Sequence, residues 1–274
     1  MLKGVYTANK KDGTLYFRSS ITYRKKHISL GSYESEIEAN KAYLEAEKIL
    51  YSPKITIQEY ESLSLLDFEK WVILINFRDN NIYFGTPIYA WTKFFYYYLS
   101  PNTILKFDVD DLFYYSSHKI MKRDGHLFVA DYGMQVNILS RYGIRSFAVP
   151  GKDYIFLNGD NTDFRHSNIK LVNQYQGVSE VIVKGKIKYK SKINIPGYFV
   201  IGYYHSETEA AIAYNKAIDI LKRNGFKKKY TPNYIENLPA SQYAEIYTQL
   251  KISEKILNLQ KKSDADASDY KNFP

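Results

Sequence analysis

The sequence predicts an α+β fold that contains two three-stranded antiparallel sheets, each with one helix on one face. Three observations predict it: an internal repeat, alternating strand patterns, and helix-capping residues at matching places. Residues 31–50, GSYESEIEANKAYLEAEKIL, align without a gap with residues 202–221, GYYHSETEAAIAYNKAIDIL. Both copies also open with Gly-Val, at residues 4–5 and 177–178. The chain therefore contains the same module twice.

Each module ends in a predicted helix. The capping boxes Ser35-x-x-Glu38 and Ser206-x-x-Glu209 mark where the helices begin. Apolar residues follow at i, i+3 and i+4 spacing, and many are alanines, so the helix can lie close to a sheet. Upstream, LYFRSSITY alternates and KHISLG follows after a turn, which predicts the second and third strands of the first copy.

The second copy has an unusual strand. In VKGKIKYKSKIN, residues 183–194, lysine occupies every second position, which predicts a single lysine-bearing face. Because the helix takes the opposite face, the lysine face is expected to be open. Two interpretations stand: a solvated edge strand protected from aggregation by charge, or a surface that binds an anionic partner.

Composition limits the possible functions. The chain has 274 residues, 45% of them hydrophobic, which excludes wholesale disorder. Its net charge of +9 favours nucleic acid or an acidic membrane surface as partner. No apolar run approaches the ~20 residues that span a bilayer, so we expect no membrane-spanning segment. Of the two anionic partners, we expect double-stranded DNA and no membrane. The absence of cysteine fits a reducing cytoplasm. The bias towards Tyr, Ile, Lys and Asn suggests an AT-rich bacterial or phage genome.

The segments GVY…LYFRSSI…ISLGSYESEIEANKAYLEA and GVSEV…GKIKYKSKI…VIGYYHSETEAAIAYNKA each resemble an AP2/ERF-type DNA-binding domain. In that family the sheet enters the major groove of duplex DNA, and its open face contacts bases and phosphates. In the first copy, the resemblance implies as contacts Tyr6, Ala8, Lys10, Arg18, Ser20, Thr22, Arg24, His27 and Ser29. In the second copy, it implies Ser179, Val181, Val183, Lys184, Lys186, Lys188, Lys190, Lys192, Asn194, Tyr198 and Val200.

The two copies are expected to contribute differently. Lysine is a point charge that suits phosphates, whereas arginine can form two hydrogen bonds to guanine. The second copy is rich in lysine and has no arginine on its strands. We therefore expect it to supply affinity more than sequence readout.

Residues 153–178, DYIFLNGDNTDFRHSNIKLVNQYQGV, resemble the ββα-metal motif of homing-type HNH endonucleases. The retained motif residues are Asn158, Gly159, Asp160, Asp163, Arg165 and Asn168. The metal carboxylate of the motif aligns with Ile155 and the general base with Phe156, and neither can do that chemistry. We therefore expect no enzyme activity and no cofactor, and we expect the retained residues to fix a loop. A substitute base would have to be His126 or His166.

These observations predict five segments: a first AP2-like domain (1–53), an aromatic-rich helical connector (54–115), a degenerate HNH-like domain (116–176), a second AP2-like domain (177–226), and a C-terminal helix with a disordered tail (227–274). The expected function is sequence-specific binding of double-stranded DNA, as in a transcriptional regulator. The alternatives are a Mg²⁺-dependent HNH-type endonuclease or nickase, and an accessory architectural DNA-binding factor. The C-terminal helix is also a candidate surface for a homodimer.

Overall fold

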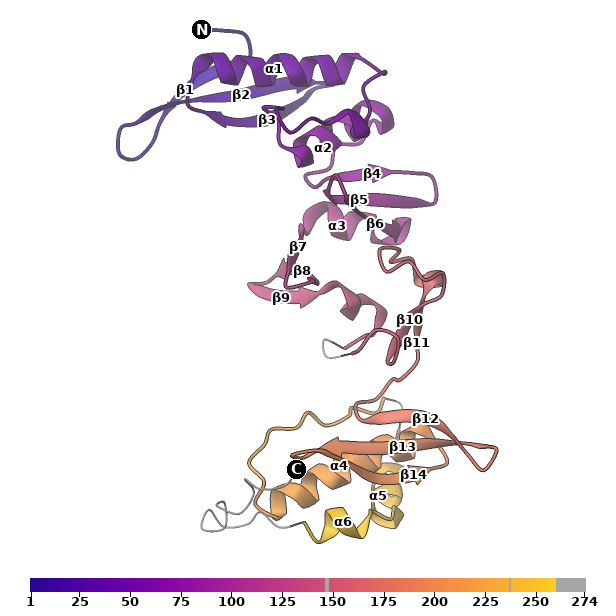
Figure 1. Ribbon diagram of the computed structural model, residues 1–274. Coiled ribbons are helices and arrows are strands. Elements are labelled where there is room, and N and C mark those ends of the chain that lie inside the picture. The colour runs from indigo at the N-terminus through magenta and orange to yellow at the C-terminus, as the bar shows by residue number, and fades with distance from the viewer. Residues whose placement is uncertain (146–147, 237, 260–274) are drawn as a thin grey trace, which may run out of the picture. The chain divides into compact units, whose positions relative to one another are not determined.

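The computed structural model describes residues 1–145, 148–236 and 238–259, and it confirms the α+β class (Figure 1). The chain divides into two compact units, which are described separately below. The first unit comprises residues 1–151 and 155–170, and the second comprises residues 152–154 and the chain from Leu171 onward. The sequence led us to expect five segments, and the structure groups them into these two units.

The first unit begins with the predicted module. Its antiparallel sheet has the order β1-β2-β3, and α1 packs on one face with Ala39, Ala42, Tyr43 and Ala46 buried. Ser35 caps the helix, and its side chain accepts a hydrogen bond from the backbone N–H of Glu38. The bounds of the elements are β1 (Val5–Asn9), β2 (Leu15–Tyr23), β3 (Lys26–Tyr33) and α1 (Glu36–Tyr51).

The second unit contains the same module, including a β-bulge at the same place. Its elements are β12 (Val178–Val183), β13 (Lys186–Asn194), β14 (Tyr198–Tyr204) and α4 (Glu207–Arg223). In the first sheet the register shifts between Ser19 and Ser20, and in the second it shifts between Ser191 and Lys192. The bulge therefore lies at the same place on the third strand of both sheets.

The repeated Gly-Val at the start of each module has a steric cause. Gly4 and Gly177 have φ angles of +77° and +74°, in the left-handed region that glycine adopts readily. A Cβ on Gly4 would lie 1.9 Å from the ring of Tyr43, and one on Gly177 would lie 2.6 Å from the ring of Tyr214. The helix tyrosine packs directly on the glycine, so no other residue fits there.

Both modules hold a following segment through the same tyrosine. Tyr33 donates a hydrogen bond from Oη to the carbonyl of Leu65 (3.0 Å), just before α2 (Phe68–Asn80) begins. Tyr204 donates to the carbonyl of Lys251 (2.9 Å), just before α6 (Glu254–Leu257) begins. The repeat therefore extends beyond the predicted module to a further helix.

The predicted helix in the connector is α2, which shares a hydrophobic core with the first module. Trp71, Val72, Leu74 and Ile75 are buried against the same cluster as Ile28 of β3. The rest of this unit contains β4 (Ile88–Ala90), β5 (Phe94–Ser100), β6 (Thr103–Asp108), α3 (Leu112–Ser117), β7 (Ile120–Arg123), β8 (His126–Asp131) and β9 (Met134–Asn137). Short 3₁₀ turns lie at Ile57–Glu59, Val109–Asp111, Ile138–Tyr142 and His166–Asn168.

The HNH-like segment supplies two strands but not the expected helix. Strand β10 (Tyr154–Phe156) pairs with β11 (Ile169–Leu171), and residues 172–177 then lead directly into β12. Within this fully described stretch no helix follows, which corrects the ββα expectation. The six connecting residues are too few for a stable helix, and they are held in place because Gln176 N–H donates to Asn233 Oδ1 (2.7 Å).

The C-terminal segment forms two helices, α5 (Ala240–Gln249) and α6, where the sequence pattern suggested one. Residues 250–253 break it, because Ser253 N–H donates to the carbonyl of Ile201 on the edge strand β14 (2.9 Å). Ile256 is fully buried in the core of the second unit. The predicted tail beyond residue 260 lies outside the described residues. No described helix is long and apolar enough to cross a bilayer.

Candidate nucleic-acid interface

The open face of the second sheet carries the predicted row of lysines. Regular antiparallel pairing with β12 keeps alternate residues of β13 on one side: Lys186, Lys188, Lys190, Lys192 and Asn194. Ser179 pairs with Lys190, and Tyr198 pairs with Asn194, so both lie on this face as predicted. Lys184 does not, and its expectation is corrected. It has a φ of +51° and, with Gly185, forms the two-residue loop between Val183 and Lys186.

Aromatic side chains lie among these cations. Lys192 Nζ is 4.6 Å from the ring centroid of Tyr198, and Lys190 Nζ is 6.0 Å from that of Tyr203. Lys188 Nζ lies 3.0 Å from both ring nitrogens of His205. Tyr203 and His205 were not among the predicted contacts. Simple alternation from Tyr198 places residue 203 on the helix side, but the bulge at Ile201 and Gly202 reverses the phase.

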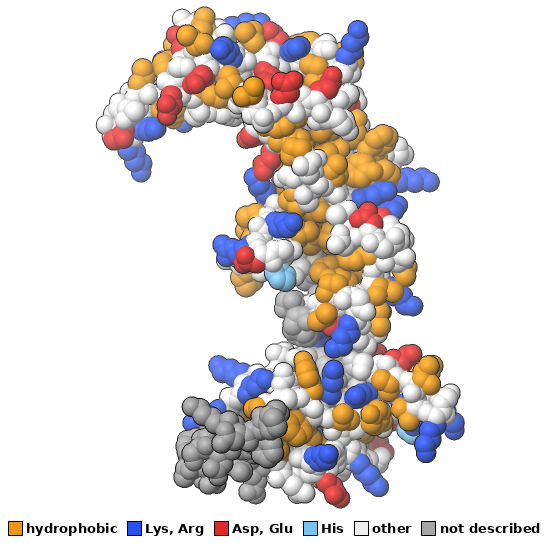
Figure 2. Space-filling model, in the orientation of Figure 1, with side chains coloured by type: hydrophobic (Ala, Val, Ile, Leu, Met, Phe, Trp, Pro, Cys, Tyr) orange, Lys and Arg blue, Asp and Glu red, His pale blue; other side chains and the backbone are white. Residues whose placement is uncertain are grey.

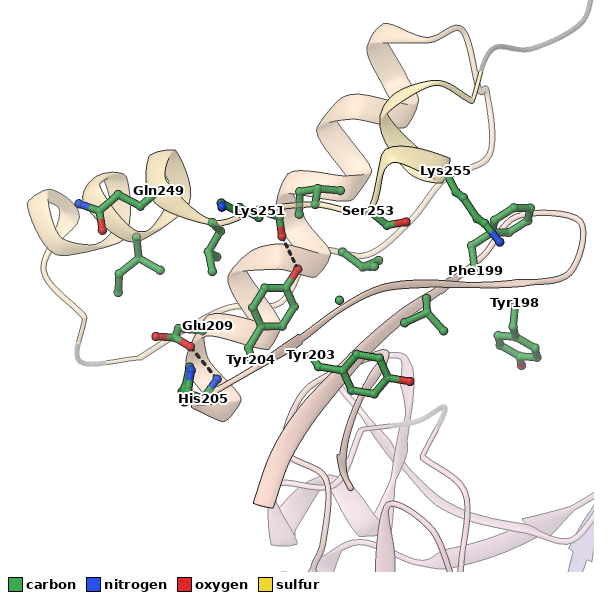
Figure 3. A pocket seen from close by; sticks show the side chains of 16 residues that line it. Tyr198, Phe199, Tyr203, Tyr204, His205, Glu209, Gln249, Lys251, Ser253 and Lys255 are labelled. Atoms are coloured by element: carbon green, nitrogen blue, oxygen red, sulfur yellow. Dashed lines mark hydrogen bonds between the residues drawn. The ribbon is translucent and has the colours of Figure 1, made fainter. Parts of the chain in front are cut away.

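Figure 3 shows the result of this reversal, with Tyr198 and Tyr203 on one side of β14 and Tyr204 pointing to the other side, towards Lys251. A hollow of about 1020 Å³ runs along the free edge of β14. The charged residues that line it are His205, Glu209, Lys251 and Lys255, so the hollow carries both signs of charge.

The positive charge of this face is not neutralised. Glu180 is the one acidic residue of the three described strands, and it pairs with Tyr189 and so lies on the helix side. None of the four β13 lysines has an ion pair within the described residues. Partial burial, together with the charges of Lys152 and Lys190, lowers the pKa of Lys192. On the side of the second unit that Figure 2 draws, basic side chains outnumber acidic ones. Such a face favours an anionic ligand.

The open face of the first sheet is less basic and more varied. Arg18 on β2 pairs with Tyr6 on β1 and with Ser32 on β3, which places these three in one row. The next rows are Ser20 with Ser29 and Thr22 with His27, so these predicted residues do share a face. Ser20 is nevertheless 8% exposed, which leaves little of it accessible. Lys10 lies in the loop just after β1. The predicted set omitted Ser32 because of the same bulge.

The guanidinium of Arg18 is positioned by a neighbouring aromatic residue. Its Nε and Nη2 donate to Tyr16 Oη at 3.1 and 2.8 Å, and its Cζ lies 5.5 Å from the ring centroid. Tyr16 pairs with Ala8 and lies on the same face, two residues from Arg18. The pair resembles the lysine–tyrosine contacts of the second sheet, so both faces combine cations with aromatic rings.

The position of Arg24 also differs from the expectation. It was expected on the second strand, but β2 ends at Tyr23 and Arg24 lies in the turn with a φ of +46°. Its Nη1 donates to the carbonyls of Phe77 (3.3 Å) and Arg78 (3.2 Å) and to Asn81 Oδ1. These groups form the end of α2, whose free carbonyls and dipole attract a cation. Arg24 therefore holds α2 against the module.

The retained HNH residues form one hydrogen-bonded loop, as expected. Asp163 accepts from Arg165 Nη2 (2.6 Å) and from Asn158 Nδ2 (3.1 Å). Asn168 donates to the carbonyl of Asp163 (2.8 Å), and Asp160 accepts from the Thr162 N–H (2.8 Å). Burial of Asp163 opposes ionisation, but hydrogen bonds and charge from Arg165 outweigh it, so the pKa of Asp163 is lowered.

The aligned catalytic positions lie in an apolar setting. Phe156 packs edge-on against Phe164, with ring centroids 5.7 Å apart. The candidate substitute His126 is exposed on β8, and His166 Nε2 lies 3.9 Å from Asp111 Oδ2. Among the described residues no group of three His, Cys, Asp or Glu side chains could hold a metal ion.

Comparison with family models, with curated proteins and with solved structures gives no match. The AP2-like and HNH-like resemblances therefore stay predictions. The function has to be argued from the faces themselves.

Proposed function

We propose that the protein binds double-stranded DNA with the open faces of its two AP2-like sheets and acts as a sequence-specific transcriptional regulator. The observation that carries the proposal is the row of four lysines on β13, which have no ion pair among the described residues and share a face on which strands β12, β13 and β14 place no acidic residue. Alternate strand residues lie about 6.8 Å apart, so the row extends over roughly 20 Å. A duplex presents one negative charge per ~1.7 Å of its axis, so about a dozen phosphates of both strands lie along this length, and those on the near side face the lysines.

The two faces have different parts in this proposal. The lysines of the second face neutralise phosphates, and Tyr198 and Tyr203 beside them offer rings that can pack on sugars or bases. On the first face, Arg18 pairs with Tyr6 and is held by Tyr16, and arginine is the side chain that best recognises guanine. The first face therefore contributes more of the sequence readout and the second more of the affinity.

Selection of genomic fragments tests this function. Purified protein is mixed with fragments of the source genome at near-physiological salt with excess competitor DNA, and the bound fragments are sequenced. The proposal predicts a few enriched sites with two recurring elements at fixed spacing. Uniform recovery would remove sequence-specific regulation and favour the architectural alternative. No recovery above that of a protein without basic faces would remove DNA binding altogether.

A further inference from the structure

The outer face of α1 carries an apolar row that its own unit leaves open. Ile37, Leu44 and Tyr51 are 62%, 48% and 68% exposed and recur at seven-residue intervals, which keeps them on one face. Lys41 and Lys48 lie between them in the row and are also exposed. Scattered exposed apolar residues are common on protein surfaces, but a row at this spacing is the pattern of a helix–helix contact.

The second module shows what covers the equivalent face. Leu44 corresponds to Asn215 in the repeat, and Asn215 Nδ2 donates to the carbonyl of Asn233 (2.8 Å) and to Tyr243 Oη (3.1 Å) on α5. Asp219, which corresponds to Lys48, accepts a hydrogen bond from Tyr247 on α5. Helix α5 therefore packs along α4, whereas the described residues of the first unit leave Ile37, Leu44 and Tyr51 of α1 exposed.

We propose that α1 packs antiparallel against α1 of a second copy of this chain. Pairing about Leu44 places Leu44 on the partner's Leu44, and Ile37 on the partner's Tyr51. The same arrangement brings Glu38 within half a turn of the partner's Lys48, so opposite charges flank the apolar contact. A parallel arrangement would instead set Lys41 against the partner's Lys41 and Lys48 against the partner's Lys48. Charge therefore selects the antiparallel form.

The contact is small, and this sets its strength. Three apolar side chains from each chain bury less than the ~1,000 Å² expected of a stable interface. Leu63, 89% exposed beside a hollow of about 350 Å³ that Lys48 also lines, can add to it. We therefore expect a weak dimer that forms at high protein concentration or where two copies are already held close together.

The geometry has a consequence for DNA, which rests on the proposed function. Helix α1 covers the face of the sheet opposite to the open face that carries Arg18. A dimer through α1 turns the two open faces away from each other, so each can hold a separate duplex. Leu44→Glu should therefore lower the bridging of two duplexes while leaving the affinity for a single duplex unchanged.

Cysteine cross-linking tests the dimer itself and does not involve DNA. The chain has no cysteine, so a single introduced thiol reports one position. Under mild oxidation at about 100 µM protein, Leu44→Cys should give a disulfide-linked dimer, because both copies of this position lie on the two-fold axis. Ile37→Cys alone and Tyr51→Cys alone should not, whereas an equimolar mixture of these two variants should. These variants serve as matched controls for exposed thiols on the same helix.

Three results would overturn the inference. The first is no cross-linked dimer with Leu44→Cys. The second is equally efficient dimers with Ile37→Cys alone and Tyr51→Cys alone, which indicates parallel pairing or random collision. The third is protection of the thiol at position 44 from maleimide in a species that sediments as a monomer, which indicates that another part of the same chain covers α1.

Discussion

Removal of three lysines from the second open face should change the salt dependence of DNA binding by a calculable amount. Lys188, Lys190 and Lys192 lie in one row and have no ion pair among the described residues, so each is free to contact a phosphate. Each lost phosphate contact lowers the slope of log K against log salt by about 0.9, so the triple alanine variant should lose about 2.7. If the plots of log K against log salt for the unaltered protein and the variant meet at 1 M salt, the affinity of the variant at 0.1 M salt is about 500-fold lower.

The assay is fluorescence anisotropy of a labelled 30-base-pair duplex across a series of salt concentrations. The matched control replaces Lys41, Lys48 and Lys222 with alanine, since these exposed lysines lie on α1 and α4 and the variant has the same net charge. Its slope should stay within about 1 of that of the unaltered protein. An unchanged slope in the face variant, or equal losses in both variants, would refute the assignment of these lysines to phosphates.

Four further outcomes follow from individual contacts. Arg24→Ala should lower the stability of the first unit by about 1–2 kcal/mol without changing DNA affinity, whereas Arg18→Ala should lower DNA affinity without changing stability. Urea unfolding followed by tryptophan fluorescence reports the stability of this unit, because Trp71 and Trp91 both lie in it. Asp163→Asn should cost the same unit about 2–3 kcal/mol at pH 7. The pKa of Asp163 is lowered on folding, so this difference is full above pH ~4 and shrinks as the pH falls through the folded-state pKa, which the same titration repeated at low pH would check. Gly177→Ala should destabilise the second unit by about 3 kcal/mol, seen in tyrosine near-ultraviolet circular dichroism, and leave the tryptophan transition unchanged. Supercoiled plasmid incubated with the protein and Mg²⁺ should stay intact; nicking that disappears in His126→Ala or His166→Ala would restore the nuclease alternative.

Much of each module was predictable from the sequence because its signals are local. The capping boxes, the alanine-rich helix faces and the alternating strands all reflect neighbours a few residues apart, and α1, β2, β13 and α4 formed where those signals lie. The lysine row of β13 is the clearest case, since the alternation of side chains along a strand is enough to determine its face.

The errors came from features without a local signal. A bulge inserts one residue and reverses the alternation, so Tyr203 and Ser32 lie on faces that counting could not assign. Lys184 belongs to the alternating lysine pattern of the sequence, but it lies in the two-residue turn that precedes β13. Arg24 was taken for a strand residue because its partners, the carbonyls at the end of α2, lie more than fifty residues away. Long-range contacts of this kind are set by tertiary packing.

The residues that resemble the HNH motif have structural roles of their own. Asn158, Asp163 and Asn168 bond to one another and to the backbone, which gives them a structural reason to be present without any metal. The helix that would complete the motif is replaced by the short link into β12. Spacing in the sequence indicated the loop, whereas the missing helix became visible in the structure.

The most direct test of the account is the reactivity of lysines towards an acetylating reagent, measured by mass spectrometry with and without a saturating duplex. The account predicts that DNA protects Lys186, Lys188, Lys190 and Lys192 on the open face, while Lys41, Lys48 and Lys222 on the helices react as before. Protection of the helix lysines instead, or equal reactivity at all seven positions with DNA bound, would contradict the claim that the open sheet faces bind the duplex.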